Sequence, residues 1–431
     1  MRRDVTRPII AVVGGGKIGL PLAAYFADNG ARVWVCDVDT ALVGKVNSGQ
    51  TPHDEPGLAE KLARTVKQGS LIATRDTTVA VAAADTVVII VAAKLTATRR
   101  IDYAQLSAAC EAVGRGIRPG TLVSIETTVP VGGCRSVLAP ALASGNLQAG
   151  RDFRFVYSPE RVKSGHIFDY LTVTPKVVGG WDAASLASGL AFYRRCLGAP
   201  VIEVPSLEAA EFVKLAGMIY RDTNIALANE LATFAAAAGL DAWSTIAAAN
   251  TDGETRLLQP GIGVGGHCTP VYPYFLFEGA ERLGIEQALA GLARRVNEAQ
   301  PRRQVERLAR TLGGLDGARV HIMGLAFRPN VREDAFNTAR PLSEALLAAG
   351  ASVTLDDPLY SIEELVLRGF TPAQPGERGQ TAVILNTAHR QYARIDFARW
   401  KANGVRAVLD GRHHWTQEEV EGAGLAYVGL G

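Results

Sequence analysis

The sequence predicts an α/β protein with two Rossmann-like, doubly wound domains joined by a long central helix. Two series of short apolar strands alternate with helical stretches, a pattern typical of parallel sheets covered by helices. Between them, residues 207–238 contain almost no Gly or Pro, which indicates one long helix. We therefore expect an NAD-binding domain at residues 1–205, a central helical domain at 206–315 and a second α/β domain at 316–431.

Composition is that of a soluble globular protein with more than one core. The chain has 431 residues, of which 48% are hydrophobic and 20% charged. A net charge of +2 does not indicate nucleic acid or an anionic membrane as a partner, and no apolar run reaches the roughly 20 residues that cross a bilayer. Five scattered cysteines argue against a disulfide framework or a zinc cluster. We expect a cytoplasmic protein without a metal site.

The first strand leads into a dinucleotide-binding turn. Residues 8–13 form a continuous apolar run, typical of a strand buried on both faces. Gly14, Gly16 and Gly19 follow in the spacing GxGxxG, which permits a tight turn, the approach of a pyrophosphate and close packing of helix on strand. The next strand ends in Asp37, whose carboxylate can bind a ribose and would repel a 2′-phosphate. The turn therefore predicts NAD rather than NADP.

Two segments of the first domain are candidate walls of an active site. Further strands are expected at residues 86–91, 122–125, 155–157, 176–178 and 201–204, in a sheet that we take to be parallel throughout. Ligands of such sheets bind beyond the carboxyl ends of the strands. Residues 126–130 and 158–161 fall at such ends.

The long helix carries a lysine in an apolar setting. Lys214 lies among Phe212, Val213 and Leu215. Two interpretations stay open, because the amine is either partly buried with its neighbours or reaches solvent at the end of its aliphatic stem.

A cysteine stands at the end of an unusually glycine-rich loop, residues 260–270. Four of the six residues 261–266 are glycine, and Cys268 follows two positions later. Glycines leave backbone amides uncovered and permit positive φ, which suits a phosphate or sugar cradle. A lone cysteine is more often a small buried hydrophobe, but here the glycines favour a functional thiol beside a bound ligand.

A second strand series starts near residue 320. Apolar runs at residues 320–327, 352–356, 382–385 and 407–410 predict another α/β unit. This unit has no GxGxxG motif, so it binds something other than a dinucleotide, or nothing.

In their order along the chain, these motifs resemble those of the UDP-sugar 6-dehydrogenases, most closely the branch that acts on UDP-N-acetylhexosamines. The segments that carry the resemblance are residues 16–21, 127–130, 157–161, 220–230, 265–268 (Gly-Gly-His-Cys) and 324–331. The resemblance covers nearly the whole chain. It implies NAD-dependent oxidation of a nucleotide sugar at C6 to the uronic acid, in polysaccharide or secondary-metabolite biosynthesis, by a homodimer or larger oligomer paired along the long helix. It also implies that the C-terminal α/β domain, residues 316–431, binds the nucleotide sugar (UDP).

The resemblance also implies roles for individual residues. Cys268 would attack the intermediate aldehyde to form a thiohemiacetal, whose oxidation gives a thioester. Lys214 would stabilise the developing oxyanion, Glu160 would act as base or position the hydrolytic water, and Thr128 would hold that water. The expected cofactor contacts are Gly14, Gly16, Lys17, Ile18, Gly19, Asp37 and Thr127. The expected substrate contacts are Arg161, Gly263, Gly265, Gly266, Phe327 and Arg328.

The chain departs from the family pattern at five places. Met218 stands in place of Asn, Tyr272 in place of Asp, and Glu254 in place of Arg. The three residues beginning at Ala335 replace Arg-Glu-Ser, and residues 93–95 replace a Pro-Thr-Pro-like turn. These departures put the completion of the reaction in doubt.

Three hypotheses therefore compete. The first is full oxidation to the carboxylate with altered groups in the site. The second is different redox chemistry on a nucleotide-type substrate, either a two-electron oxidation or attack on another carbon. The third is a non-catalytic binding or scaffold subunit, against which the retention of Cys268, Lys214 and Glu160 argues.

Overall fold

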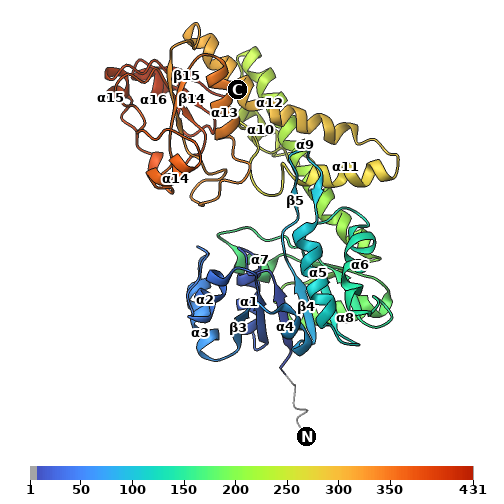
Figure 1. The fold of residues 1–431 in the computed structure, drawn as a ribbon. Coiled ribbons are helices and arrows are strands. Elements are labelled where there is room, and N and C mark those ends of the chain that lie inside the picture. Colours follow the sequence, from blue (N-terminus) through green and yellow to red (C-terminus); the bar gives the residue numbers. More distant parts are fainter. Residues whose placement is uncertain (1–6, 431) are drawn as a thin grey trace. The chain divides into compact units, whose positions relative to one another are not determined.

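The computed structural model describes residues 7–430 and divides into two compact units (Figure 1). Unit 1 contains the chain up to residue 217 together with residues 274–286, and unit 2 contains residues 218–273 and the chain from 287 onward. The long helix α9 runs from Leu207 to Ala238, the span expected from the sequence. Its first third belongs to unit 1 and the remainder to unit 2.

Unit 1 is built on an eight-stranded sheet in the order β10-β9-β8-β7-β4-β1-β2-β3. The strands are β1 (Ile9–Val13), β2 (Arg32–Cys36), β3 (Leu71–Thr74), β4 (Thr86–Ile89), β7 (Leu122–Ile125), β8 (Arg154–Tyr157), β9 (Lys176–Gly180) and β10 (Val201–Val204). Successive residues of β1 enter two different cores, with Ile10 and Val12 in one and Ala11 and Val13 in the other. Both faces of the sheet are therefore covered, as its continuous apolar strands predict.

Helices and one small hairpin complete unit 1. The helices are α1 (Gly19–Asp28), α2 (Thr40–Asn47), α3 (Leu58–Lys67), α4 (Thr77–Ala83), α5 (Ala104–Gly116), α6 (Ala139–Leu142), α7 (Ile167–Val173) and α8 (Ala183–Cys196). The hairpin pairs β5 (Lys94–Leu95) with β6 (Ile101–Asp102).

The sheet of unit 1 is not parallel throughout, so that part of the prediction is wrong. β9 runs antiparallel to β8, with Val156 opposite Gly180 and Tyr157 opposite Gly179, and β10 is parallel to β9. The chain between β8 and β9 holds only the short helix α7 and turns back at the carboxyl end of β8. A parallel pair would need a full crossover to the other end of the strands. The amino end of β9, Lys176, consequently lies at the carboxyl edge of β8.

Unit 2 contains a five-stranded parallel sheet in the order β12-β11-β13-β14-β15. Its strands are β11 (Arg319–Met323), β12 (Ser352–Asp356), β13 (Ala382–Leu385), β14 (Ala407–Asp410) and β15 (Ala426–Val428). β11 ends at Met323, although the apolar run continues to residue 327. It ends there because Gly324 has a φ of +97°, a left-handed conformation in which the chain leaves the strand direction.

The helices of unit 2 lie before the sheet and between its strands. They are α10 (Ala242–Ala249), α12 (Ala288–Leu312), α13 (Ala339–Ala348), α14 (Ile362–Leu367), α15 (Phe397–Ala402) and α16 (Gln417–Gly422). α11 (Tyr272–Arg282) begins in unit 2 directly after the cysteine loop and continues into unit 1.

Candidate functional site

The turn after β1 has the geometry that the GxGxxG spacing predicts. Gly14 has a φ of +107°, and its amide donates to the carbonyl of Cys36 at 2.8 Å. A Cβ at Gly19 would lie 1.9 Å from the carbonyl oxygen of Gly14, so α1 packs directly on the turn. A Cβ at Gly16 would meet nothing within 4 Å. The turn is thus tightly packed at its two ends and open at Gly16, where the backbone is accessible to a ligand.

Asp37 lies at the carboxyl end of β2, beside this turn. One carboxylate oxygen accepts from the amide of Gly15 at 2.8 Å, and the other accepts from the amide of Asp39 at 3.0 Å. The carboxylate is therefore held in place at the strand end, as ribose binding requires. Together with the open backbone at Gly16 it fits the adenosine and pyrophosphate of NAD.

A loop that the sequence analysis did not single out joins this turn to α7. His53 places its Nε2 3.0 Å from the carbonyl of Gly15. Two residues later, the buried Glu55 accepts from the amides of Gly165 and Ile167, at 2.6 and 2.8 Å. Because Glu55 ties the start of α7 to the loop that touches the glycine turn, the cofactor turn and the segment after Glu160 are parts of one connected structure.

The remaining predicted cofactor residues differ in exposure. Lys17 is exposed and Ile18 is half-buried at the start of α1. Thr127 is buried just beyond β7, where its hydroxyl donates to the carbonyl of Val91 at 2.7 Å. Thr128, the expected holder of water, is buried beside it.

Lys214 and Glu160 meet within unit 1. The side chain of Lys214 is only 9% exposed, and its Nζ donates to the backbone carbonyl of Glu160 at 2.6 Å. Of the two interpretations left open by the sequence, burial is correct. The carboxylate of Glu160 accepts from the amide of Val162 at 2.5 Å. Burial raises the pKa of Glu160 above its usual value, while the ammonium groups of Lys214 and Lys176 oppose that rise.

A buried polar network next to Glu160 escaped the sequence analysis. Lys176 forms an ion pair of 2.6 Å with Glu126, and the hydroxyl of Tyr193 donates to the other oxygen of Glu126 at 2.7 Å. The hydroxyls of Tyr193 and Ser124 lie 2.7 Å apart. The reversal of β9 explains the network, because continuing the β8–β9 register past Tyr157 brings Lys176 level with Glu160. A lysine at the start of an otherwise apolar strand was the available signal.

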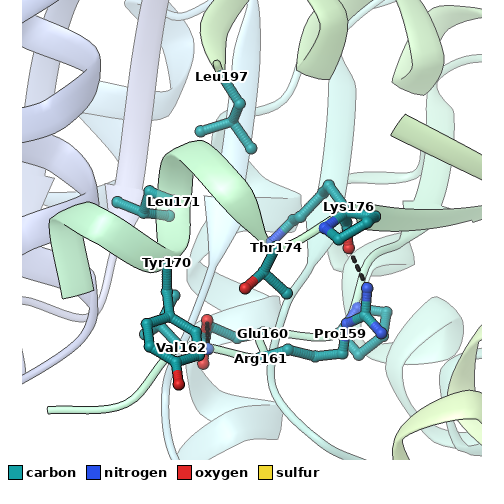
Figure 2. Close-up of a pocket in the computed structure, with 10 residues that line it drawn as sticks. Pro159, Glu160, Arg161, Val162, Tyr170, Leu171, Thr174, Lys176 and Leu197 are labelled. Atoms are coloured by element: carbon teal, nitrogen blue, oxygen red, sulfur yellow. Dashed lines mark hydrogen bonds between the residues drawn. The ribbon is translucent and has the colours of Figure 1, made fainter. Parts of the chain in front are cut away.

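Glu160 and Lys176 line a small cavity of about 20 Å³, shown in Figure 2. This volume suffices for about one water molecule. Arg161 also lines the cavity, and its guanidinium donates to the carbonyl of Pro175. Arg161 therefore fastens the segment that precedes β9, and its expected contact with substrate stays a prediction.

In unit 2, the glycines of the cysteine loop are largely covered by protein. A Cβ at Gly263 would lie 2.6 Å from Thr338, and one at Gly265 would lie 2.6 Å from Phe327. A Cβ at Gly266 would lie 3.0 Å from the ring of Phe327, and the amide of Gly266 donates to the carbonyl of Ala335 at 2.9 Å. The expectation of uncovered amides is wrong at Gly266, because the segment 327–338 packs on the loop.

Cys268 itself is half-buried, whereas Cys36, Cys110, Cys134 and Cys196 are buried. Its carbonyl accepts from the amides of Val271 and Tyr272, at 3.1 and 2.9 Å, so the cysteine sits at the turn that begins α11. Next to it, the ring of His267 contacts that of Phe327 edge-on at 6.4 Å, and Arg328 is half-buried. The loop thus carries a half-buried cysteine on a backbone that is fixed by its own unit.

The turn at Gly14–Gly19, the acid at the end of β2 and the doubly wound sheet define a protein that binds a dinucleotide. Residues 9–197 match the NAD-binding domain, and residues 208–299 the central domain, of the UDP-glucose/GDP-mannose dehydrogenase family. This chain belongs to that family, and NAD is its cofactor.

Relatives match along nearly the whole chain. The UDP-N-acetyl-D-mannosamine dehydrogenase of Pyrococcus horikoshii is 30% identical, over 98% of this chain and 99% of that protein. The NDP-N-acetyl-D-galactosaminuronic acid dehydrogenase of Ralstonia nicotianae is 29% identical, over 97% and 98%. The solved structure of a UDP-glucose dehydrogenase from Pyrobaculum islandicum superposes with a TM-score of 0.88 at 30% identity, covering 100% of this chain and 99% of that one.

Residues 7–430 contain neither a cluster of metal ligands nor a helix suited to cross a membrane. No group of three or more His, Cys, Asp or Glu side chains there is placed to hold a metal ion. No helix in this part of the chain combines the length and hydropathy needed to cross a membrane.

Proposed function

We propose that this protein oxidises a nucleotide sugar of the UDP-N-acetylhexosamine kind at C6 to the uronic acid, with a thioester on Cys268. The observation that carries the proposal is the half-buried thiol at the end of the Gly-Gly-His-Cys loop, in a chain whose other four cysteines are buried. Relatives that match almost end to end are named as dehydrogenases of acetamido sugars. The alternatives of other redox chemistry or a scaffold have no such support.

The reaction converts a primary alcohol and water into a carboxylate. NAD, when bound, takes up a hydride in each of the two oxidations, so two molecules are reduced per sugar. The thiol of Cys268 adds to the C6 aldehyde to form a thiohemiacetal, and water later cleaves the thioester and restores the thiol. We assign Lys214 to the developing oxyanion, and the carboxylate of Glu160 to proton removal from water.

The other predicted residues complete the proposal. Thr128 holds the hydrolytic water. Cofactor contacts come from Gly14, Gly16, Lys17, Ile18, Gly19, Asp37 and Thr127, and substrate contacts from Arg161, Gly263, Gly265, Gly266, Phe327 and Arg328. Met218 and Tyr272 stand where the resemblance expects an amide and a carboxylate, so we expect turnover to be slow. The paired change Met218→Asn and Tyr272→Asp is expected to raise the rate of carboxylate formation.

The stoichiometry of NADH tests this function. The full-length protein is incubated with a panel of UDP-, TDP- and other nucleotide sugars, and NADH and carboxylate are counted per sugar consumed. We expect about two NADH and one carboxylate with the preferred sugar, and no carboxylate from Cys268→Ser. One NADH per sugar with an active Cys268→Ser protein would replace the thioester scheme by a two-electron oxidation.

We also propose that two copies of the chain pair along α9. Tyr220, Leu227, Leu231 and Phe234 are exposed, and their spacing of seven, four and three residues places them on one face of the helix. An exposed apolar stripe of this kind suits a self-complementary interface. Sedimentation is expected to give twice the chain mass of 45.7 kDa. Leu227→Glu with Phe234→Glu is expected to give monomers, and a monomeric wild type would contradict the pairing.

We place the protein in the cytoplasm, in polysaccharide or secondary-metabolite biosynthesis. All five cysteines are free thiols, which suits a reducing compartment. Fractionation of cells that express the protein with a tag would test the location.

A further inference from the structure

The segment that leads into the cysteine loop is held by asparagine side chains. Residues 255–261 form neither helix nor strand, yet the backbone groups of Arg256, Leu257, Leu258 and Gly261 are hydrogen-bonded to side-chain amides. Backbone groups outside regular structure usually bind water or turn partners. Here the amides take the place of a neighbouring strand.

Two of these asparagines, Asn250 and Asn224, bind the backbone of residues 256–258. Asn250, the residue after α10, accepts from the amide of Leu257 at 2.7 Å and donates to its carbonyl at 2.9 Å. Asn224 on α9 accepts from the amide of Leu258 at 2.7 Å and donates to the carbonyl of Arg256 at 2.8 Å. Each side chain thus makes the two bonds that a paired strand would make.

The third asparagine is buried and belongs to a relay of fixed direction. The amide of Gly261 donates to Oδ1 of Asn229 at 2.9 Å, so the NH₂ group of Asn229 points to Oδ1 of Asn297, 2.9 Å away. Asn297 in turn donates to both the backbone and the side chain of Asp222, at 2.8 and 2.9 Å. Since a backbone amide can only donate, neither asparagine can flip without losing a bond.

A buried ion pair ends the relay. The carboxylate of Asp222 lies 2.7 Å from Nε of Arg294 on α12. Asp222, Asn229, Arg294 and Asn297 are each at most 3% exposed. Water therefore has no access to replace a missing partner, and loss of one bond leaves a buried polar group unsatisfied.

At the end opposite to Arg294, the relay meets the start of the cysteine loop at Gly261. Beyond Gly261, the side chain of Ile262 is buried in the core of the C-terminal sheet. A Cβ at Gly261 would lie 3.1 Å from the guanidinium of Arg412, so Gly261 is enclosed between Asn229 and Arg412. The hydrogen bond of Gly261 therefore helps to hold the start of the loop whose end carries Cys268, seven residues later.

We propose that Asn224, Asn229 and Asn250 are positioning residues that set the loop of Cys268, with Asn229 having the largest effect. The ranking follows from burial, since water can replace the bonds of the exposed Asn250 but not those of Asn229. The catalytic role of Cys268 rests on the proposed function, whereas the setting of its loop does not.

Alkylation of Cys268 by iodoacetamide tests the proposal without substrate. The full-length protein is labelled for timed intervals, and the modified peptide is quantified by mass spectrometry. Asn229→Ser keeps a small polar side chain but is too short for both bonds. We expect Cys268 to be labelled at least about fivefold faster in this variant, because the freed loop exposes its thiol, and about twofold faster in Asn224→Ser and Asn250→Ser.

Asn47→Ser is the matched control. Asn47 makes the same pair of bonds to another segment, accepting from the amide of Ala73 at 2.7 Å and donating to its carbonyl at 2.9 Å. Its loss should leave the labelling rate of Cys268 unchanged. Equal rates in wild type and a folded Asn229→Ser protein would overturn the proposal. If Asn229→Ser does not fold, the double variant Asn224→Ser with Asn250→Ser decides, and a rate equal to wild type overturns it.

Measurement of kcat and of KM for NAD shows whether Asn229→Ser affects the cysteine loop alone or destabilises the whole protein. Together with the labelling rate, it also shows whether the proposed function fails independently of this inference. In Asn229→Ser we expect kcat for carboxylate formation to fall at least about tenfold with an unchanged KM for NAD, because the NAD-binding unit is intact. A wild type that forms no carboxylate, but whose labelling responds to Asn229→Ser, would remove the proposed function and leave this inference standing. If the wild type forms two NADH per sugar and the labelling rate does not respond to Asn229→Ser, the proposed function stands and this inference is overturned.

Discussion

Two glycine-rich loops of this protein look alike in sequence and differ in what surrounds them. In the turn Gly14–Gly19, a Cβ at Gly16 would meet nothing within 4 Å, so the backbone faces open space. In the loop Gly261–Gly266, added Cβ atoms at Gly263 and Gly265 would lie 2.6 Å from neighbouring residues of the same unit. Glycine is needed in the first loop to admit a ligand and in the second to admit the protein's own side chains.

The largest effect is expected from Gly19→Ala. Its Cβ would lie 1.9 Å from the carbonyl oxygen of Gly14, a backbone atom that cannot move without displacing α1 from the turn. We expect at least about 3 kcal/mol of lost stability and no measurable NAD binding. Thermal unfolding and NAD titration measure both. A variant that binds NAD within threefold of wild type would show that this end of the turn is not packed as described.

Gly265→Ala is expected to come next and to act on the other loop. The new methyl would press on Phe327 and on the carbonyl of Phe336, 2.9 Å away, at a cost of about 2 kcal/mol. Carboxylate formation should fall while NAD affinity stays at the wild-type value. Unfolding curves, NAD titration and product assays check this. Wild-type stability in this variant would mean that the cysteine loop is open, like the cofactor turn.

Gly16→Ala sharpens the comparison because it should affect binding alone. The methyl meets no protein atom, so the melting temperature should stay within about 1 °C of wild type. NAD affinity should fall about tenfold, since the methyl occupies the approach of the pyrophosphate. A lower melting temperature with unchanged affinity would reverse the roles assigned to the two loops.

The smallest effect is expected in the pH profile of the wild-type protein. It tests the chemistry at Glu160 and not the cofactor turn. Glu160 must be ionised to act as a base, and burial raises its pKa. Carboxylate formation should therefore decline, as the pH is lowered, at a higher pH than an ordinary glutamate of pKa about 4.3 would give. The rate profile of wild type is compared with that of Glu160→Gln, which should lose most activity and this acidic limb. An unchanged limb in Glu160→Gln would assign it to another group.

Local patterns were sufficient for much of the fold and for the cofactor. The turn at Gly14, the acid at Asp37 and the helix at residues 207–238 depend on residues close in sequence, and the structure has them where the spacing predicts. The antiparallel β9 and the end of β11 at Met323 were missed, because an apolar run does not reveal which way a strand pairs or where a glycine turns the chain.

The sequence by itself determined that the chain belongs to a family of nucleotide-sugar dehydrogenases, that it binds NAD and that Cys268 is the thiol to examine. Tertiary structure alone decided that Lys214 is buried against Glu160, that Lys176 and Glu126 form an ion pair, and what covers the cysteine loop. The physical reason is the distance along the chain between partners. Gly265 meets Phe327 and Asn229 meets Asn297 across more than 60 residues, and only the packing of helices and sheets brings such residues together.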